Sequence, residues 1–302
     1  MQKKLIVITG PTASGKTSLA IALAQQLGCE IISADSRQVF RDIPIGTAAP
    51  TQDELSRAPH HMVGFLALDA YYSAAQFEAD VMRLLPDLFS RSDYAILCGG
   101  SMMYIDAVCR GIDELPTISE STRAHCLTIV QNEGLPGITD RLAELDPAYL
   151  RQADTQNTRR MVHALEICLQ AGMPYSALRT GRVKERPFAI SKFAIVPPRE
   201  EMFYRINRRV EAMMAEGFLE EVRRVYPLRH LNSLNTVGYK ELFIHFDGVW
   251  DLPTAIARIQ KNTRVFAKKQ LTWLKKSADY IPLSTDIDNS INTILTYLES
   301  EA

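Results

Sequence analysis

The sequence predicts an α/β fold, with a parallel sheet flanked by helices and interrupted by a helical insertion. Two observations predict the sheet. Short β-branched, apolar runs alternate with segments of helical periodicity between residues 3 and 98, and strands joined by such crossover helices are parallel with helices on both faces. The first run also ends in glycine directly before a helical segment. A third observation predicts the insertion, because residues 113–186 show helical segments and turns but no convincing strand.

The elements follow in a simple order along the chain. Ser73 is a suitable N-cap for the second helix, and residues 44–59 are rich in turn residues and are expected to form a loop. A single long helix with an apolar stripe from 203 to 225 is expected after Pro197 and Pro198. We expect strands at Lys3–Thr9, Cys29–Ala34, Tyr94–Cys98, Phe193–Val196 and Tyr280–Leu283, and the other helices at Thr17–Leu27, Ser73–Leu88 and Pro253–Lys276. The predicted core is therefore 1–112 and 187–302, and the insertion is 113–186.

The composition argues against a membrane or secreted protein. No apolar run reaches 18 residues, and the N-terminus lacks the features of a signal peptide, so we expect a cytoplasmic protein with no membrane span. The five cysteines are scattered without a CxxC pair, which favours reduced, buried thiols. The net charge is -1, but Lys and Arg number 11 against 18 acidic residues in 1–150, and 23 against 17 in 151–302. A basic second half suits a polyanionic partner, although a solvated surface would look the same.

Residues Gly10 to Thr17 read GPTASGKT and fit the pattern G-x-x-x-x-G-K-[ST] between a strand and a helix. Glycines let the backbone form a cradle of N–H groups around a phosphate, and the helix N-terminus adds partial positive charge. Lys16 adds a full charge, and the Thr17 hydroxyl is placed to bind Mg²⁺. The core is thus expected to resemble P-loop NTPases. The motif predicts a bound di- or triphosphate, and a P-loop small-molecule kinase is the default function on this motif alone.

Polar residues follow two further strands, at Asp35 and at Ser101. Ligands of parallel sheets bind at the carboxyl ends of the strands, so Asp35 should lie near the bound phosphates. Three roles remain open for it: holding Mg²⁺, accepting a proton from a nucleophile, or capping the next turn.

Together these motifs resemble the tRNA dimethylallyltransferase (tRNA isopentenyltransferase) family. The phosphate loop is followed by Ile31–Gln38 (IISADSRQ) and Ile45–Ala48 (IGTA), and the resemblance extends along nearly the whole chain in the right order. The further matching segments are Pro59–His61, Tyr72–Phe77, Gly99–Ser101, Asn157–Arg160, Ala164–Glu166, Thr236–Leu242, Asn262–Arg264 and Ala267–Trp273.

The resemblance implies transfer of a dimethylallyl group from dimethylallyl diphosphate to N6 of the adenosine at position 37 of tRNA, 3′ to the anticodon. Diphosphate leaves, Mg²⁺ assists, and the partners are a tRNA anticodon stem-loop and the donor; a monomer is expected. Asp35 resembles the general base, and Ser101 and Arg123 resemble residues that stabilise the transition state. The diphosphate site would comprise Gly10, Thr12, Ala13, Ser14, Gly15, Lys16, Thr17 and, one turn into the long helix, Arg205. The tRNA site would comprise Asp35, Ser36, Arg37, Gln38, Arg159, Arg160, Met161, Val162, His163, Arg264 and Lys268, with the insertion contacting tRNA.

The sequence departs from the family pattern at several positions. Ser101 stands where threonine is usual and keeps the hydroxyl. Gly64 replaces an aspartate, Ala49 a lysine and His163 an arginine, so these individual contacts differ. His60 and His61 are adjacent but no cluster of further ligands accompanies them, which favours a structural role. Four cations of the last long helix share one helical face, which either is solvated or contacts RNA; they are Lys261, Arg264, Lys268 and Lys275. Arg208 is a second candidate beside Arg205 for the diphosphate.

Overall fold

The computed structural model describes residues 2–277 and 279–301. The chain divides into two compact units, residues 1–109 with 185–302, and residues 110–184. These bounds lie within three residues of those expected from the sequence. Among the described residues, no helix combines the length and the apolar character needed to cross a membrane.

A parallel sheet forms the centre of the first unit, which confirms the predicted fold class. Its strand order is β3-β2-β4-β1-β5-β6. The strands are β1 (Lys4–Thr9), β2 (Ile31–Ser33), β3 (His60–His61), β4 (Tyr94–Gly99), β5 (Ala189–Ile195) and β6 (Ile281–Leu283).

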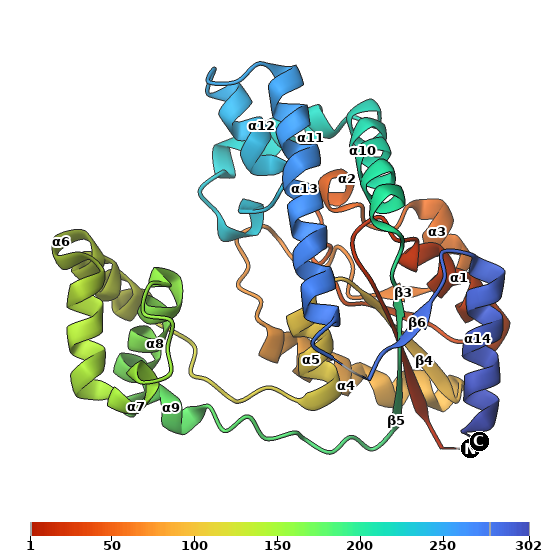
Figure 1. Cartoon of the computed structure of the whole chain (residues 1–302), viewed down its shortest axis with the longest axis horizontal. Coiled ribbons are helices and arrows are strands. Elements are labelled where there is room, and N and C mark those ends of the chain that lie inside the picture. Colours follow the sequence, from red (N-terminus) through yellow and green to blue (C-terminus); the bar gives the residue numbers. More distant parts are fainter. Residues whose placement is uncertain (1, 278, 302) are drawn as a thin grey trace. The chain divides into compact units, whose positions relative to one another are not determined.

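Along the chain, the helices of the first unit occur between successive strands and after the last strand (Figure 1). They are α1 (Lys16–Leu27), α2 (Pro44–Thr47), α3 (Gln52–Arg57), α4 (Ala74–Arg91), α5 (Met102–Arg110), α10 (Arg199–Ala215), α11 (Phe218–Val225), α12 (Tyr239–Phe246), α13 (Leu252–Leu274) and α14 (Ile287–Ser300), with short 3-10 turns at Tyr226–Leu228 and Asn232–Leu234.

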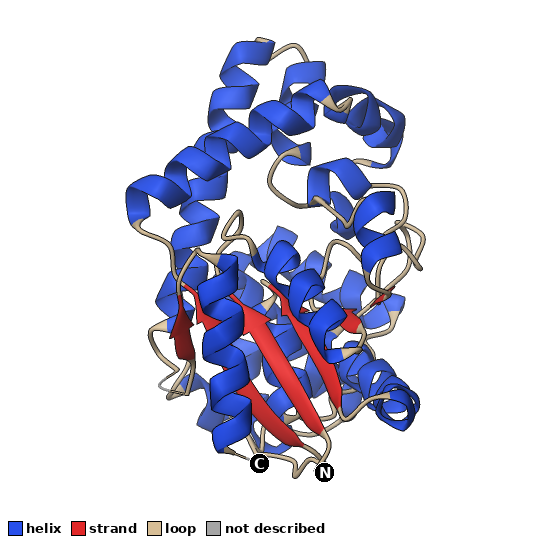
Figure 2. Cartoon of the chain, turned by 90° about the vertical axis from the view of Figure 1, so that its right-hand side faces the viewer, coloured by secondary structure: helices blue, strands red, loops and turns tan. Residues whose placement is uncertain are grey.

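Helices cover both faces of the sheet (Figure 2). Successive side chains of a strand point to opposite faces, and β1 shows the result. Ile6 and Ile8 belong to the apolar core that contains the buried residues of α1 and α14, whereas Leu5 and Val7 belong to the core that contains those of α4 and α5. A strand that is apolar on both faces is therefore buried on both, as its sequence predicts.

The second unit is a helical bundle built around its own core. It contains α6 (Glu120–Leu145), which is broken at Gly134, with α7 (Pro147–Leu150), α8 (Thr158–Ala171) and α9 (Tyr175–Leu178). Its two ends are paired, because the backbone N–H of Lys184 donates to the carbonyl oxygen of Arg110 at 2.8 Å. The core of this unit is formed by Cys126, Ile129, Ile138, Leu142, Met161, Ala164, Leu165 and Cys168.

Several local expectations are wrong. Residues 44–59 contain two short helices, and the second is stabilised by a capping box in which Thr51 and Glu54 bond each other's backbone N–H groups. The single long helix expected after residue 198 is two helices, α10 and α11, separated at Gly217, whose φ of 96° lies in the left-handed region. The structure also contains β3, α5, α12 and α14, which were not expected from the sequence. Ser73 caps α4 as predicted.

Candidate active site

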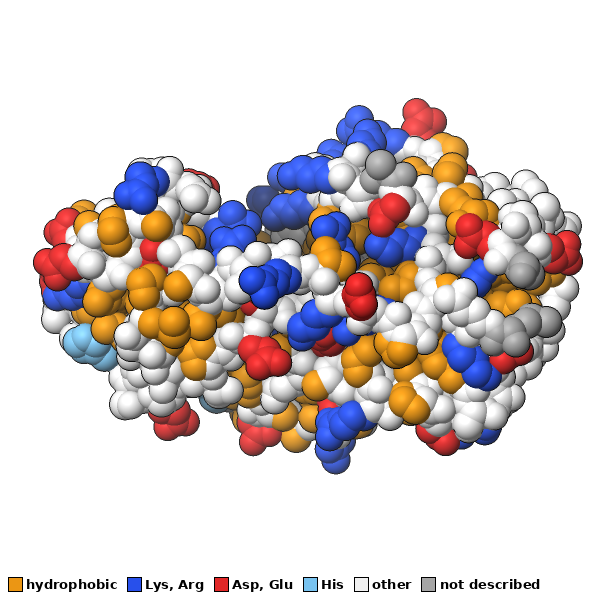
Figure 3. Space-filling model, turned by 90° about the horizontal axis from the view of Figure 1, so that it is seen from below, with side chains coloured by type: hydrophobic (Ala, Val, Ile, Leu, Met, Phe, Trp, Pro, Cys, Tyr) orange, Lys and Arg blue, Asp and Glu red, His pale blue; other side chains and the backbone are white. Residues whose placement is uncertain are grey.

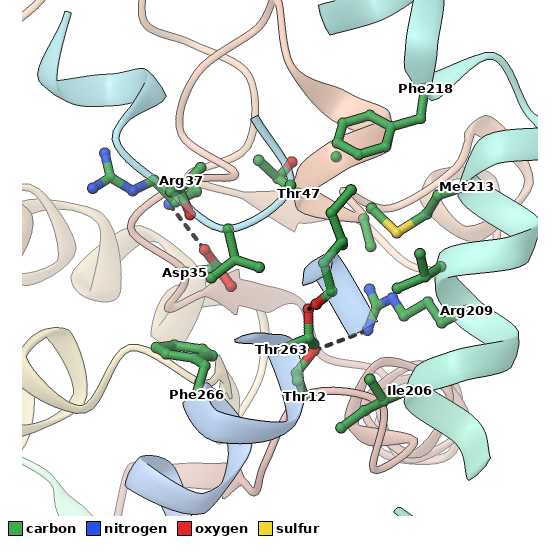
Figure 4. Close-up of a pocket in the computed structure, with 18 of the residues that line it drawn as sticks. Thr12, Asp35, Arg37, Thr47, Ile206, Arg209, Met213, Phe218, Thr263 and Phe266 are labelled. Atoms are coloured by element: carbon green, nitrogen blue, oxygen red, sulfur yellow. Dashed lines mark hydrogen bonds between the residues drawn. The ribbon is translucent and has the colours of Figure 1, made fainter. Parts of the chain in front are cut away.

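A cavity of about 360 Å³ lies in the first unit, beyond the carboxyl ends of β1, β2 and β4. Asp35 and Ser101 line it, as does Thr12 of the phosphate loop, so the residues that follow three adjacent strands meet in one place. Figure 4 shows Asp35 and Thr12 in this cavity. The opposite wall is apolar and comes from the second half of the chain. This apolar wall consists of Ile206, Val210 and Met213 of α10, Phe218 of α11, and Ile259 of α13.

The rest of the phosphate loop lines a second cavity of about 510 Å³. The loop adopts the conformation its motif predicts: Ala13 and Gly15 have positive φ angles of 62° and 93°, and α1 begins at Lys16. Successive N–H groups in such a loop form an anion-binding concavity. The side of this cavity facing the loop carries Arg205, Arg208 and Arg209 of α10.

Arg209 lines both cavities and therefore joins them. Its Nη1 atom lies 3.4 Å from the Thr12 hydroxyl, to which it donates. Burial lowers the pKa of Arg209, while the nearby Asp35 carboxylate raises it. Burial also lowers the pKa of Lys16 to about 8, where Cys98 and Asp35 oppose the shift and Arg209 adds to it. Lys16 donates to the carbonyl oxygen of Pro11 at 2.8 Å. Two partly buried cations, Lys16 and Arg209, thus lie at one loop, an arrangement that favours a polyanionic ligand.

Asp35 and Ser101 are joined through the segment that follows β2. The Asp35 carboxylate accepts the backbone N–H of Arg37 at 2.9 Å, so it does cap a turn. A carboxylate has further acceptor sites, and Asp35 also lines the cavity, so capping does not conflict with the other two roles. The Ser101 hydroxyl accepts the N–H of Ser36 at 2.8 Å and donates to the Ser36 hydroxyl at 3.2 Å. Ser101 therefore fixes the residue next to Asp35.

Arg37 and Gln38, expected to contact tRNA, form contacts within the protein. The Arg37 guanidinium donates to the carbonyl oxygens of Asn232 and Ser233 at 3.1 and 3.0 Å. The Gln38 amide nitrogen donates to the carbonyl oxygens of Thr47 and Ala48, and its oxygen accepts the Ser33 hydroxyl at 2.9 Å. Arg37 lines the cavity, and Gln38 holds the backbone of Thr47 and Ala48, which line it as well.

The remaining predicted residues of the first unit are placed as follows. Arg205 forms an ion pair with Glu201 at 2.6 Å beside the phosphate loop. Arg264 and Lys268 of α13 pack over the ring of Phe203, and Arg264 also donates to Asn207. They line neither of the two cavities. Gly10 directly follows β1.

The second unit carries the other predicted residues, around the start of α8 and on α6. Arg159 and Arg160 are exposed there. His163 Nδ1 and Arg123 Nε lie 3.7 and 4.0 Å from the carboxylate of Glu166. Val162 is partly buried against the bundle core.

One residue of that group corrects the sequence analysis. Met161 is fully buried in the core of the second unit, so its side chain is not available to RNA. Position 161 faces the core because it shares an apolar helical stripe with Leu165 and Cys168, which are also buried, whereas Leu169 at the edge of the stripe is exposed.

Sequence reasoning missed three components of the site: Arg209, Gln270 and the apolar wall. Gln270 is a buried residue of α13 that bonds both Thr12 and Gly100. Arg209 lies four residues after Arg205, and helical spacing could have placed both on one face. Gln270 and the wall carry no such signal, because they come close to the phosphate loop only through the tertiary fold.

Other candidate groups have structural roles. All five cysteines are buried and free, as predicted. His61 pairs with Glu30 at 2.6 Å, and His60 bonds the carbonyl oxygen of Ala58. Within residues 2–277 and 279–301, no group of three or more His, Cys, Asp or Glu residues could hold a metal ion. On the face in Figure 3, basic and acidic side chains are interspersed, so the charge difference between the chain halves does not appear there as one continuous basic field.

Comparisons with known proteins agree with this geometry. The chain is 50% identical over 291 residues to tRNA dimethylallyltransferase 1 of Phocaeicola vulgatus, covering 96% of this chain and 97% of that protein. Its structure is similar to the crystal structure of the full-length tRNA isopentenylpyrophosphate transferase from Bacillus halodurans, with a TM-score of 0.72, 32% identity, and coverage of 99% and 96% of the two chains. A structure of a eukaryotic dimethylallyltransferase acting on tRNA gives a TM-score of 0.80 at 25% identity, covering 99% of this chain and 79% of that one.

The sequence pattern of the IPP transferase family matches residues 38–277, which is most of the chain. The matched region contains the apolar wall of the 360 Å³ cavity and the whole second unit. The phosphate loop and Asp35 precede the matched region, and the relatives aligned over nearly the full length extend the likeness to them. This chain belongs to the IPP transferase family.

Proposed function

We propose that this protein transfers a dimethylallyl group from dimethylallyl diphosphate to N6 of the adenosine at position 37 of tRNA, releasing diphosphate. One observation carries the proposal: a phosphate-binding loop, a carboxylate and an apolar wall adjoin a single cavity. A phosphotransferase would need the first two, whereas the apolar wall suits a hydrocarbon group. The relatives named as tRNA dimethylallyltransferases support the same substrate pair.

The diphosphate of the donor would bind in the cradle of the phosphate loop. Backbone N–H groups of the loop residues that line the second cavity, together with Lys16, Arg205 and Arg209, can donate to its oxygens. Negative charge gathers on the diphosphate as it leaves, so fixed donors at that place stabilise the transition state more than the bound substrate. The donor tail would then extend from Thr12 along the apolar wall.

The reaction forms one bond and breaks another. The adenine N6 attacks C1 of the donor, the C1–O bond breaks, and its electrons leave with the diphosphate. The N6 lone pair is delocalised into the ring, so removing the N6 proton as the new bond forms assists the attack. Asp35 would accept that proton, and Ser101, through Ser36, would keep Asp35 in place. The role of Arg123 in stabilising the transition state stays a prediction.

The donor set suits Mg²⁺ brought by the diphosphate. Mg²⁺ commonly binds through phosphate oxygens, waters and only one or two protein ligands, and the second cavity contains the Thr17 hydroxyl with a single carboxylate, that of Glu54. Thr17 would hold the ion, which would neutralise charge on the leaving diphosphate.

The tRNA would present its anticodon loop with the target adenine flipped out of the stack, since N6 must reach the cavity. The exposed Arg159 and Arg160 in the second unit, with Val162, His163, Arg264 and Lys268, are the proposed contacts to the RNA. Ser36 and the neighbouring backbone would meet the base near Asp35. We further propose that the enzyme acts as a monomer in the cytoplasm.

The test measures donor choice and turnover separately. Calorimetry with dimethylallyl diphosphate and with ATP, each with Mg²⁺, should show preference for the former. Transfer to an anticodon stem-loop, followed by mass spectrometry, should fall about 10²–10⁴-fold in Asp35→Asn while donor binding is retained. Tight binding of ATP without prenyl transfer would instead establish a kinase.

A further inference from the structure

Met213 and Phe218 form the far end of the apolar wall. On α10, Ile206, Arg209, Val210 and Met213 line the cavity, at spacings that place them on one helical face. Arg209 contacts Thr12, where the diphosphate end of the donor would lie. Met213 follows one turn later, about 6 Å further along the helix axis. Figure 4 shows Arg209, Met213 and Phe218 in succession along one side of the cavity.

Phe218 closes the far end because the chain turns there. Helix α10 ends at Ala215, and Gly217, with a φ of 96°, starts α11 in a new direction. The turn brings the Phe218 ring into the lining of the cavity although the residue is fully buried. The apolar wall is therefore short, and Phe218 closes its far end.

The Phe218 side chain at this closed end is held in place by its neighbours. The Phe218 ring packs edge-on against the Tyr239 ring, with centroids 5.3 Å apart at 84°. Tyr239 is itself fixed, because its hydroxyl donates to the buried carboxylate of Glu221 at 2.6 Å. Behind the ring lies the backbone of Gly46, where even a Cβ atom would be 2.3 Å from Phe218 Cε2. In a close-packed interior such a ring keeps its position.

We propose that Met213 and Phe218 set the length of the prenyl chain that the enzyme accepts, admitting five carbons and excluding ten. The inference rests on the proposed function and adds the donor's size class to it. Met213 follows Arg209 by about 6 Å along the helix axis, a rise that leaves room for the four-carbon backbone of a dimethylallyl group. A geranyl chain has a second five-carbon unit, which would have to occupy the volume of the Met213 and Phe218 side chains.

The experiment compares kcat/KM for dimethylallyl diphosphate and geranyl diphosphate with an anticodon stem-loop as acceptor. The wild-type protein should prefer dimethylallyl diphosphate by at least ~100-fold, since even one methylene group in a tight pocket discriminates by about 10–200-fold. Phe218→Ala and Met213→Ala should each raise the geranyl-to-dimethylallyl ratio by at least ~10-fold. Met213 is only partly buried, so its variant stays folded even if Phe218→Ala does not.

Phe243→Ala is the matched control, because Phe243 belongs to the same apolar core as Phe218 but does not line the cavity. It should leave the ratio unchanged. Equal use of both donors by the wild-type protein would overturn the proposal, as would an unchanged ratio in Met213→Ala and in folded Phe218→Ala. A ratio raised equally by Phe243→Ala would also overturn it. If no prenyl transfer from dimethylallyl diphosphate occurs at all, the proposed function itself has failed.

Discussion

The side-chain oxygen of Gln270 accepts the backbone N–H of Thr12 at 2.9 Å, and the side-chain nitrogen donates to the carbonyl oxygen of Gly100, also at 2.9 Å. Gln270 is 3% exposed. It comes from α13, more than 250 residues after Thr12 in the chain. One amide group thus holds the phosphate loop and the segment after β4 at a fixed separation.

Removing that amide should loosen the phosphate loop. Gln270→Met keeps the size of the side chain but leaves the Thr12 N–H and the Gly100 carbonyl without their partner. Each lost bond costs roughly 1–3 kcal/mol when the group stays buried, so donor affinity should fall by about tenfold or more. Calorimetry with dimethylallyl diphosphate measures this. Lys269→Met, at an exposed neighbouring position, should bind the donor normally; equal weakening in both variants would contradict a specific role for Gln270.

Donor binding should weaken as the pH rises through about 8. The lowered pKa of Lys16 means that its charged form is present below about pH 8 and is lost above it. The diphosphate binds the charged form, so Kd should be constant at pH 6.5–7 and rise about tenfold for each pH unit above 8. Lys16→Met should bind more weakly and show no such break. A wild-type Kd that stays flat to pH 9.5 would show that Lys16 keeps its charge.

Arg209 should matter more than its neighbour Arg208. Arg209 is partly buried and lines both cavities, whereas Arg208 is exposed and pairs with Glu211. A hydrogen bond to a charged group contributes about 1.5–3 kcal/mol, so Arg209→Met should weaken donor binding by roughly 10–100-fold. Arg208→Met should have a smaller effect. Similar losses in both would indicate a diffuse basic field instead of a specific contact.

The buried ion pair of Arg186 and Glu78 should be important for stability. The two groups lie 2.6 Å apart, and Arg186 also donates to the carbonyl oxygens of Ala107 and Val108. Arg186→Met leaves the Glu78 carboxylate buried without this partner, which typically costs 3–5 kcal/mol. Urea unfolding should show the loss. The double variant Arg186→Met, Glu78→Gln should recover part of it, and no recovery would mean that the carbonyl contacts dominate.

Affinity for the anticodon stem-loop should fall steeply with salt. Each cation that contacts a phosphate contributes a log–log slope of about -0.7 to -0.9. Arg159→Ala, Arg160→Ala, Arg264→Ala and Lys268→Ala should each reduce the slope by roughly one unit if that residue touches a phosphate. An unchanged slope in all four would mean that these cations form a solvated surface.

The sequence was sufficient for the strands other than β3 and for the phosphate loop, because these follow local rules. β-branched runs, crossover helices and a glycine-rich turn are specified by neighbouring residues, so β1, α1 and the positions of Asp35 and Ser101 follow from spacing. Asp35, Ser101 and Thr12 do line one cavity.

The second half of the site could not be derived in this way. Gln270, Met213 and Phe218 reach the cavity from α13, α10 and α11, and nothing in their local sequence indicates which strand ends they will face. The helix break at Gly217 could not be predicted either, because an apolar stripe that continues across a break has the same spacing as one helix. Gln38 is expected to contact RNA only from the family resemblance, and its hydrogen bonds in the structure lie within the protein.

The hydrogen bond between Lys184 and Arg110 bears on how the molecule could be rearranged. Because the second unit starts and ends at adjacent points, the segment resembles a cassette with a single attachment site. A short turn could connect residue 109 to residue 185 without pulling on the sheet. Replacing the cassette in this way should yield a minimal protein that still binds the prenyl diphosphate. It would also allow recognition segments from relatives to be exchanged as whole pieces, so that RNA preference could be altered without rebuilding the donor pocket.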